Sequence, residues 1–140
     1  MAKDLWINLP VKNLARSIVF YEAMGFQRNM GPGNTESSAC FLVGDKRVVL
    51  MLFVDAAFAG FAGAPVSDPA LGAEVLISVG ADSPEEVDAL AARASQGGGD
   101  VFAKPGDSGP GMYGCGLRDP DGHRWNLLSM GQTPRDRRVG

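Results

Sequence analysis

The sequence predicts an α+β fold made of two paired βαβββ modules that form a cleft between curved mixed sheets. Two observations support this fold class. The order strand, helix and three strands occurs twice along the 140 residues. The halves align at an offset of 68 where Val11 is matched with Val79, and at an offset of 75 where Cys40 is matched with Cys115. We therefore expect a first module at residues 1–56 and a second at 73–131, with a linker loop at 57–72 and a tail at 132–140.

The first module begins with alternation of apolar and other residues over 4–11, which is typical of a strand. Asn13 then caps a helix, and Gly25 is expected to end it in a left-handed conformation. The apolar residues of this helix recur at helical spacing: Leu14, Ile18, Val19, Tyr21 and Met24. Three strands are predicted at 26–30, 38–43 and 47–54. The pair Gly44-Asp45 indicates a hairpin between the last two strands.

The second module repeats this order. Its first strand, 73–79, alternates Val75, Ile77 and Val79 with Glu74, Leu76 and Ser78. Ser83, Pro84 and two glutamates then begin a helix that ends at the glycines from Gly97. Three short strands are expected at 100–103, 112–118 and 124–130. A shift of one residue in the alignment of the halves would reverse the inward face of each strand.

Two long connections carry residues that could close over the cleft. Residues 55–71 contain Phe58 and Phe61 among alanines and glycines, whereas 104–114 is rich in glycine and proline. The first connection is compatible with a short helix, with a covering loop, or with a surface that a second copy of the chain covers.

Composition excludes several classes of function. The net charge of −3 and the pI of about 5.0 give no electrostatic footprint for nucleic acid. The longest apolar run, 48–54, is too short to cross a membrane, and the first residues do not read as a signal peptide. We expect a cytoplasmic protein. We interpret Cys40 and Cys115 as small apolar core residues, with a redox pair as the alternative.

The segments INLPVKNLARSIVFYEAMGF and GMYGCGLRDPDGHRWNLL resemble the glyoxalase/bleomycin-resistance/extradiol-dioxygenase superfamily, also called vicinal oxygen chelate proteins. Members of this superfamily include lyases, dioxygenases, fosfomycin-modifying transferases and resistance proteins that only bind a drug. The resemblance therefore implies the fold and leaves the activity open. Because dimers are common in the superfamily, we also expect a homodimer.

The resemblance implies four inward positions for metal ligands, at Trp6, Met51, Glu74 and Asn126. Only Glu74 is a hard anionic ligand, because indole has no available lone pair and a thioether is soft. A catalytic site of this type uses about three protein ligands. We therefore expect no cofactor, and a divalent metal is possible but disfavoured. The lone histidine, His123, is interpreted as an exposed turn residue.

The same positions predict a ligand pocket without metal. Trp6, Asn8, Met51 and Asn126 form an aromatic and amide-bearing wall that suits a small organic ligand. Glu74 is the candidate catalytic residue, as a general base, with an exposed or paired carboxylate as the alternative. The favoured function is metal-independent binding of a small molecule. The competing hypothesis is a lyase or isomerase resembling lactoylglutathione lyase, or a dioxygenase-like enzyme, assisted by a metal or by Glu74.

Overall fold

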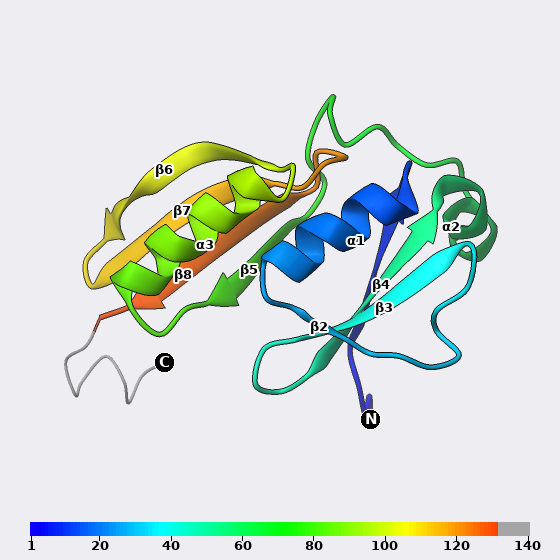
Figure 1. The fold of residues 1–140 in the computed structure, drawn as a ribbon, viewed down its shortest axis with the longest axis horizontal. Coiled ribbons are helices and arrows are strands. Elements are labelled where there is room, and N and C mark those ends of the chain that lie inside the picture. Colours follow the sequence, from blue (N-terminus) through cyan, green and yellow to red (C-terminus); the bar gives the residue numbers. More distant parts are fainter. Residues whose placement is uncertain (132–140) are drawn as a thin grey trace. The chain divides into compact units, whose positions relative to one another are not determined.

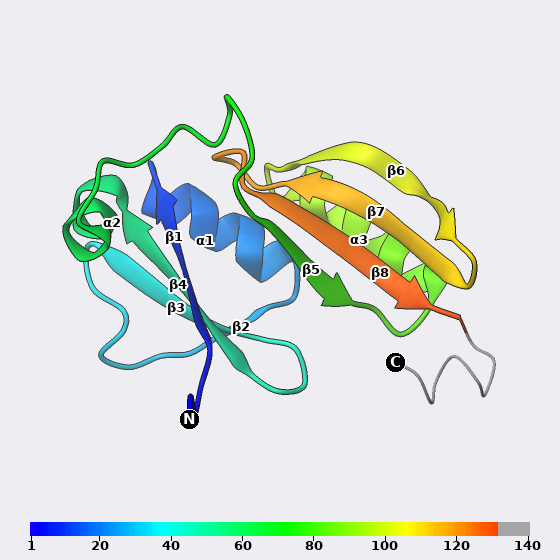
Figure 2. The same cartoon turned by 180° about the vertical axis from the view of Figure 1, so that it is seen from behind.

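The computed structural model describes residues 1–131, so the predicted tail at 132–140 lies outside the described residues. The chain divides into two compact units, and the boundary in the sequence lies between Asp68 and Pro69. Each unit contains one four-stranded mixed sheet with a long helix packed on one face, as Figures 1 and 2 show from opposite sides. The predicted α+β class with two βαβββ modules is confirmed. The expectation of a cleft shared by both modules stays a prediction.

The first unit contains a sheet in the order β1-β4-β3-β2, in which β1 and β4 are parallel and the other pairs antiparallel. Its elements are β1 (Trp6–Val11), α1 (Leu14–Ala23), β2 (Gln27–Arg28), β3 (Ser38–Val43), β4 (Val48–Val54) and α2 (Asp55–Ala62). Helix α2 occupies part of the stretch expected to be a linker loop. A short helix was one of the three alternatives stated for this stretch.

Helix α1 has the predicted ends. The side chain of Asn13 accepts a hydrogen bond from the backbone N–H of Arg16, and Gly25 follows the last turn with φ of 81°. Its core face differs from the apolar pattern, because Val19 is 59% exposed whereas Ser17 and Phe20 are buried. Helical spacing alone did not identify which apolar side chains meet the sheet.

The strand register separates the two faces of the first sheet. Leu9 and Val11 of β1 pair with Leu52 and Val54 of β4, and the first three of these are buried under α1. Alternate residues must point to the opposite, open face, because successive side chains of a strand alternate. On that face lie Trp6, Asn8, Met51 and Phe53.

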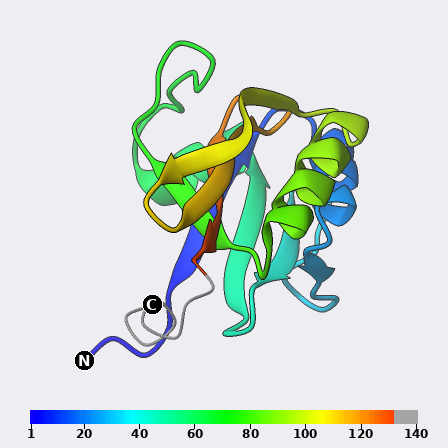
Figure 3. The same cartoon turned by 90° about the vertical axis from the view of Figure 1, so that its left-hand side faces the viewer.

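The second unit has the sheet order β5-β8-β7-β6, with β5 and β8 parallel. Its elements are β5 (Leu76–Gly80), α3 (Pro84–Gln96), β6 (Asp100–Gly109), β7 (Met112–Arg118) and β8 (Arg124–Met130). Figure 3 shows α3 along one face of this sheet. The side chain of Ser83 accepts a hydrogen bond from the N–H of Glu86, whose carboxylate accepts one from Asp82, which completes the predicted cap.

Two strand predictions in this unit were wrong. β6 continues to Gly109, although residues from Lys104 were expected to form a loop. Register shifts between β6 and β7 accommodate the Pro105-Gly106 segment, and such bulges are tolerated on an edge strand. β5 begins only at Leu76, so Glu74 lies in a bend before the strand and not in it.

Buried residues of β8 pack on the helix-covered face. Trp125 is 2% exposed and Leu127 is fully buried, which agrees with the predicted orientation of Trp125 toward a helix. Asn126 therefore lies on the opposite, open face. No helix in residues 1–131 is long and apolar enough to cross a membrane.

Candidate functional site

A hollow of about 500 Å³ lies in the first unit, between the open face of the sheet and helix α2. Its volume is within the range of pockets that hold small organic ligands. The lining residues come from β1, β4 and α2: Trp6, Asn8, Met51, Phe53, Phe58, Phe61 and Ala62. Three residues proposed from the sequence, Trp6, Asn8 and Met51, thus lie together.

The sheet side of the hollow follows from the register of two parallel strands. Asn8 of β1 is the direct neighbour of Met51 on β4, and Phe53 follows two residues later on the same face. Trp6 precedes Asn8 by two residues and is 61% exposed. These four side chains make a continuous surface because they share one face of adjacent strands.

Helix α2 forms the other side. Phe58 and Phe61 are three residues apart, so they project from the same face of the helix. The rings of Phe61 and Phe53 are 5.1 Å apart between centroids, in a tilted arrangement. The Lys12 ammonium lies 3.3 Å from the carboxylate of Asp55, in the first turn, which connects the start of α2 to the end of β1.

The polar groups of the hollow are few and neutral. None of its lining side chains carries a charge. Within the described residues, neither the Asn8 amide nor the Trp6 indole N–H has a hydrogen-bond partner. A ligand would therefore meet aromatic rings, a thioether and these two hydrogen-bonding groups.

The segment 29–37, which connects β2 and β3, packs against the side chain of Met51. A Cβ atom added at Gly33 would lie 3.2 Å from the Cβ of Cys40 and 3.6 Å from the sulfur of Met51. Cys40 is the cross-strand neighbour of Met51 on the same face of the sheet. The segment thus packs closely against the residue that forms the floor of the hollow.

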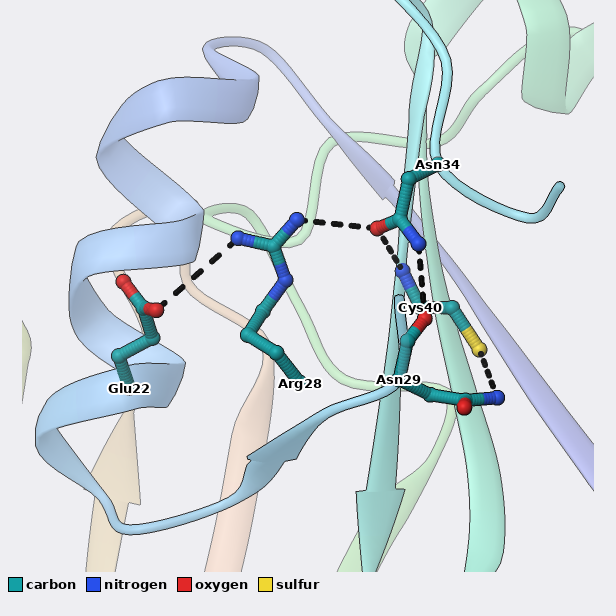
Figure 4. A network of polar contacts seen from close by, with 5 residues as sticks. All are labelled: Glu22, Arg28, Asn29, Asn34 and Cys40. Carbon is teal, nitrogen blue, oxygen red and sulfur yellow. Dashed lines mark hydrogen bonds and ion pairs between the residues drawn. The ribbon is translucent and has the colours of Figure 1, made fainter. Parts of the chain in front are cut away.

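Asn34 holds this segment in place, as Figure 4 shows. Its side-chain carbonyl accepts hydrogen bonds from the backbone N–H of Cys40 at 3.1 Å and from the guanidinium of Arg28 at 3.0 Å. Its side-chain N–H₂ donates to the carbonyl oxygens of Asn29 at 2.7 Å and Gly31 at 3.3 Å. One amide therefore joins the first residues of the segment to β2 and β3.

Arg28 anchors this network to α1. Its guanidinium lies 5.5 Å from the centroid of the Phe41 ring and 4.0 Å from the carboxylate of Glu22. The Nε atom of Arg28 is buried and lacks a hydrogen-bond partner in the described part of the chain. The side-chain amide of Asn29 donates a weak hydrogen bond to the sulfur of Cys40 at 3.5 Å.

The remaining predicted residues lie in the second unit, outside this hollow. Asn126 pairs with Ser78 on β5 and with Gly116 on β7, on the open face of that sheet. Glu74 is exposed, so the expectation of an inward strand carboxylate is corrected: the strand begins two residues after it. His123 is half-buried in a turn, where the carboxylate of Asp119 accepts its backbone N–H.

A smaller hollow of about 270 Å³ lies in the second unit near this turn. Its lining carries both signs of charge, including Arg118, Arg124, Asp119 and Asp121. The carboxylate of Asp119 accepts three backbone N–H groups, which identifies it as the residue that shapes the turn. The charged residues of this smaller hollow thus include one that shapes the turn. The hollow of the first unit is the better candidate for a ligand site.

The residues at the four implied ligand positions do not fit a catalytic divalent metal. Trp6 presents an indole and Met51 a soft thioether, while Glu74 is exposed in a bend outside its strand. Residues 1–131 contain no group of three or more histidine, cysteine, aspartate or glutamate side chains arranged to hold a metal ion.

The two cysteines are free and buried. Burial raises the pKa of the Cys115 thiol from 9.0 to about 11, and the negative charge of Asp88 adds to this shift. The same carboxylate accepts a hydrogen bond of 2.7 Å from the Tyr113 hydroxyl and thereby raises the pKa of Tyr113. Cys115 is thus poorly suited to act as a nucleophile.

Comparison with known proteins extends these observations. No curated protein matches the chain. A solved structure of a hypothetical protein from S. aureus is 32% identical, covers 92% of this chain and 95% of its own, and superimposes with a TM-score of 0.80. Two further structures share the fold: a lactoylglutathione lyase from Agrobacterium tumefaciens and a bleomycin resistance determinant encoded on transposon Tn5.

The lyase is 21% identical, with 92% and 94% of the two chains covered and a TM-score of 0.64. The resistance determinant is 20% identical, with 94% and 100% covered and a TM-score of 0.63. Residues 5–127 match the family described as the Glyoxalase/Bleomycin resistance protein/Dioxygenase superfamily. The resemblance noted in the sequence is thereby confirmed, and the chain belongs to this superfamily.

Proposed function

We propose that this protein binds a small organic ligand in the hollow of its first unit and needs no metal ion to do so. The observation that carries the proposal is the joint position of Trp6, Asn8 and Met51 in one hollow of about 500 Å³. The donor chemistry of the implied metal positions supports the second part, because those side chains are mostly poor ligands for a divalent cation.

Each proposed residue has a physical role in binding. Trp6 offers a flat, partly exposed ring for stacking, and Met51 offers a polarizable floor. Asn8 supplies one neutral donor and one neutral acceptor. For Asn126 we propose a ligand contact on the open face of the second sheet, where this residue pairs with Gly116 of β7.

The lyase or isomerase hypothesis finds less support in the geometry. It assigns Glu74 as a general base, and this carboxylate is exposed in a bend and is not among the residues that line the hollow. A Glu74→Gln variant tests the hypothesis directly. Turnover of a candidate substrate by the native protein that disappears in the variant, with affinity retained, would establish catalysis.

A thermal-shift screen of small molecules tests the binding proposal. A ligand of the native state raises the melting temperature by mass action, and this increase should persist in the presence of a chelator. The shift should be lost in Trp6→Ala and retained in Phe102→Ala, a control that removes another partly exposed ring from the second unit. Shifts that survive Trp6→Ala, or stoichiometric metal in protein purified without chelator, would contradict the proposal.

We also propose a homodimer. Large apolar side chains are exposed on and before β5, among them Leu71, Val75 and Leu76. Contiguous exposed apolar surface favours association between copies. Light scattering at several protein concentrations measures the mass, and a monomer at all of them would refute this assembly.

A further inference from the structure

We infer that the hollow selects an uncharged, flat aromatic molecule that carries a carbonyl or amide group. This inference rests on the proposed function and adds the chemical class of the ligand. Four of the seven lining residues are aromatic: Trp6, Phe53, Phe58 and Phe61. The other three contribute a thioether, a methyl group and a single side-chain amide.

The charge of the lining sets the charge of the ligand. A charged group that enters the hollow loses water and meets no opposite charge among the lining side chains. The Lys12 ammonium and the Asp55 carboxylate, at the end of β1 and the start of α2, lie 3.3 Å apart and offset each other. Neither is part of the lining.

Anions are disfavoured most strongly. The faces of aromatic rings carry partial negative charge, so four rings repel a carboxylate or phosphate. The two available N–H donor groups, on Asn8 and Trp6, are neutral and do not replace a guanidinium or ammonium partner.

A cation would gain attraction from the ring faces, but it would lose water without any carboxylate in the lining to replace it. An uncharged ring gains the stacking and loses little hydration. The neutral form of a ligand therefore has the advantage over both charged forms.

The shape and polarity of the hollow narrow the class further. Trp6 and Phe53 stand on the sheet, while Phe58 and Phe61 stand on the facing side of α2, so a flat ring can contact both surfaces. Phe61 is 79% exposed and lines the hollow, so its ring is accessible to a ligand. The Asn8 amide, without a partner in residues 1–131, can donate a hydrogen bond to the carbonyl oxygen of a ligand and can accept one from the N–H of an amide.

Three probes with the same naphthalene ring test this inference by titration calorimetry. They are 2-naphthamide, which is neutral, 2-naphthoate, which is anionic, and (2-naphthyl)trimethylammonium, which is cationic. We expect 2-naphthamide to bind at least about tenfold more tightly than either charged probe. Phe58→Ala should weaken its binding by about tenfold or more, and Asn8→Leu should weaken it by a similar factor.

Phe102→Ala is the matched control and should leave the affinity unchanged, because Phe102 does not line this hollow. Equal or tighter binding of either charged probe would overturn the inference, as would failure of the neutral probe to bind. The proposed function would still stand in those cases if another ligand from the screen depends on Trp6. If no ligand depends on Trp6, both proposals fail.

Discussion

Replacing Asn34 tests whether its side chain holds the segment 29–37, between β2 and β3, against the sheet. In Asn34→Ala four hydrogen bonds are lost, two made by each end of the amide. The backbone N–H of Cys40 loses its acceptor, and that residue is 5% exposed. The guanidinium of Arg28 loses the acceptor at 3.0 Å and keeps, within residues 1–131, the Glu22 carboxylate at 4.0 Å and the Phe41 ring at 5.5 Å.

The magnitude follows from the burial of each group. A typical hydrogen bond contributes about 1 kcal/mol net, and a buried donor without a partner costs about 1–3 kcal/mol. Water replaces the bonds to Asn29 and Gly31, which lie near the surface. We therefore expect Asn34→Ala to lower the free energy of unfolding by about 2–3 kcal/mol. In a chain of this size that corresponds to roughly 5–10 °C in melting temperature.

Urea and thermal unfolding followed by circular dichroism measure this change. Asn29→Ala is the matched control, because it removes the same side chain from the same segment. The Asn29 side chain makes only the 3.5 Å contact to sulfur among the described residues, so its loss should cost less than about 1 kcal/mol. Equal losses for the two variants, or a loss below about 1 kcal/mol for Asn34→Ala, would refute the reasoning.

Three further predictions concern the second unit. Gly116→Ala would place a Cβ atom 2.5 Å from the Phe102 ring, so stability should fall by about 1–3 kcal/mol, and urea melts should show recovery when Phe102→Ala is added. Ser83→Ala removes the acceptor of the Glu86 N–H and should lower the free energy of unfolding by about 1 kcal/mol, as measured by calorimetry. The same substitution at an exposed serine that caps no helix should leave the free energy of unfolding unchanged. The Cys115 thiol, with a pKa of about 11, should react slowly with iodoacetamide at neutral pH, as followed by mass spectrometry. Because folding raises this pKa, the associated stabilisation is present below pH 9.0 and lost as the pH rises through about 11. Rapid native labelling at neutral pH would contradict the assigned burial.

Local sequence signals account for most of the elements. Asn13 and Ser83 cap their helices as predicted, because a short polar side chain satisfies a free backbone N–H at a helix start in almost any surrounding. The strand Ser38–Val43 was predicted with its observed bounds. In these places local chemistry and tertiary packing favour the same conformation.

Predictions were wrong where local sequence signals and the pairing of distant strands favour different structures. Pro105 and Gly106 are typical of loops, yet they lie within β6, where bulges next to β7 absorb them. Glu74 belongs to an alternating pattern that runs from residue 73, whereas the strand begins two residues after Glu74, at Leu76. Alternation alone does not show where backbone pairing with β8 begins, since pairing depends on a strand far away in the sequence.

The candidate site was partly predictable. The resemblance pointed to Trp6 and Met51, and the alternation of β1 placed Asn8 on the same face. Phe53 and Ala62 were missed. Phe58 and Phe61 were expected on a connection for which a short helix, a covering loop and a dimer surface were left open, and the structure contains the helix. Their spacing of three residues was the available signal for a shared helix face.

By itself the sequence determined the repeated βαβββ order, because that order depends on short-range periodicity, and the superfamily, because its motifs consist of residue types at fixed spacing. Only the tertiary structure decided that Trp6, Asn8 and Met51 share a hollow with the rings of α2. The reason is physical: β1 and β4 are some forty residues apart in the chain and become neighbours only through backbone pairing. The side chains that surround one ligand are selected by that pairing register.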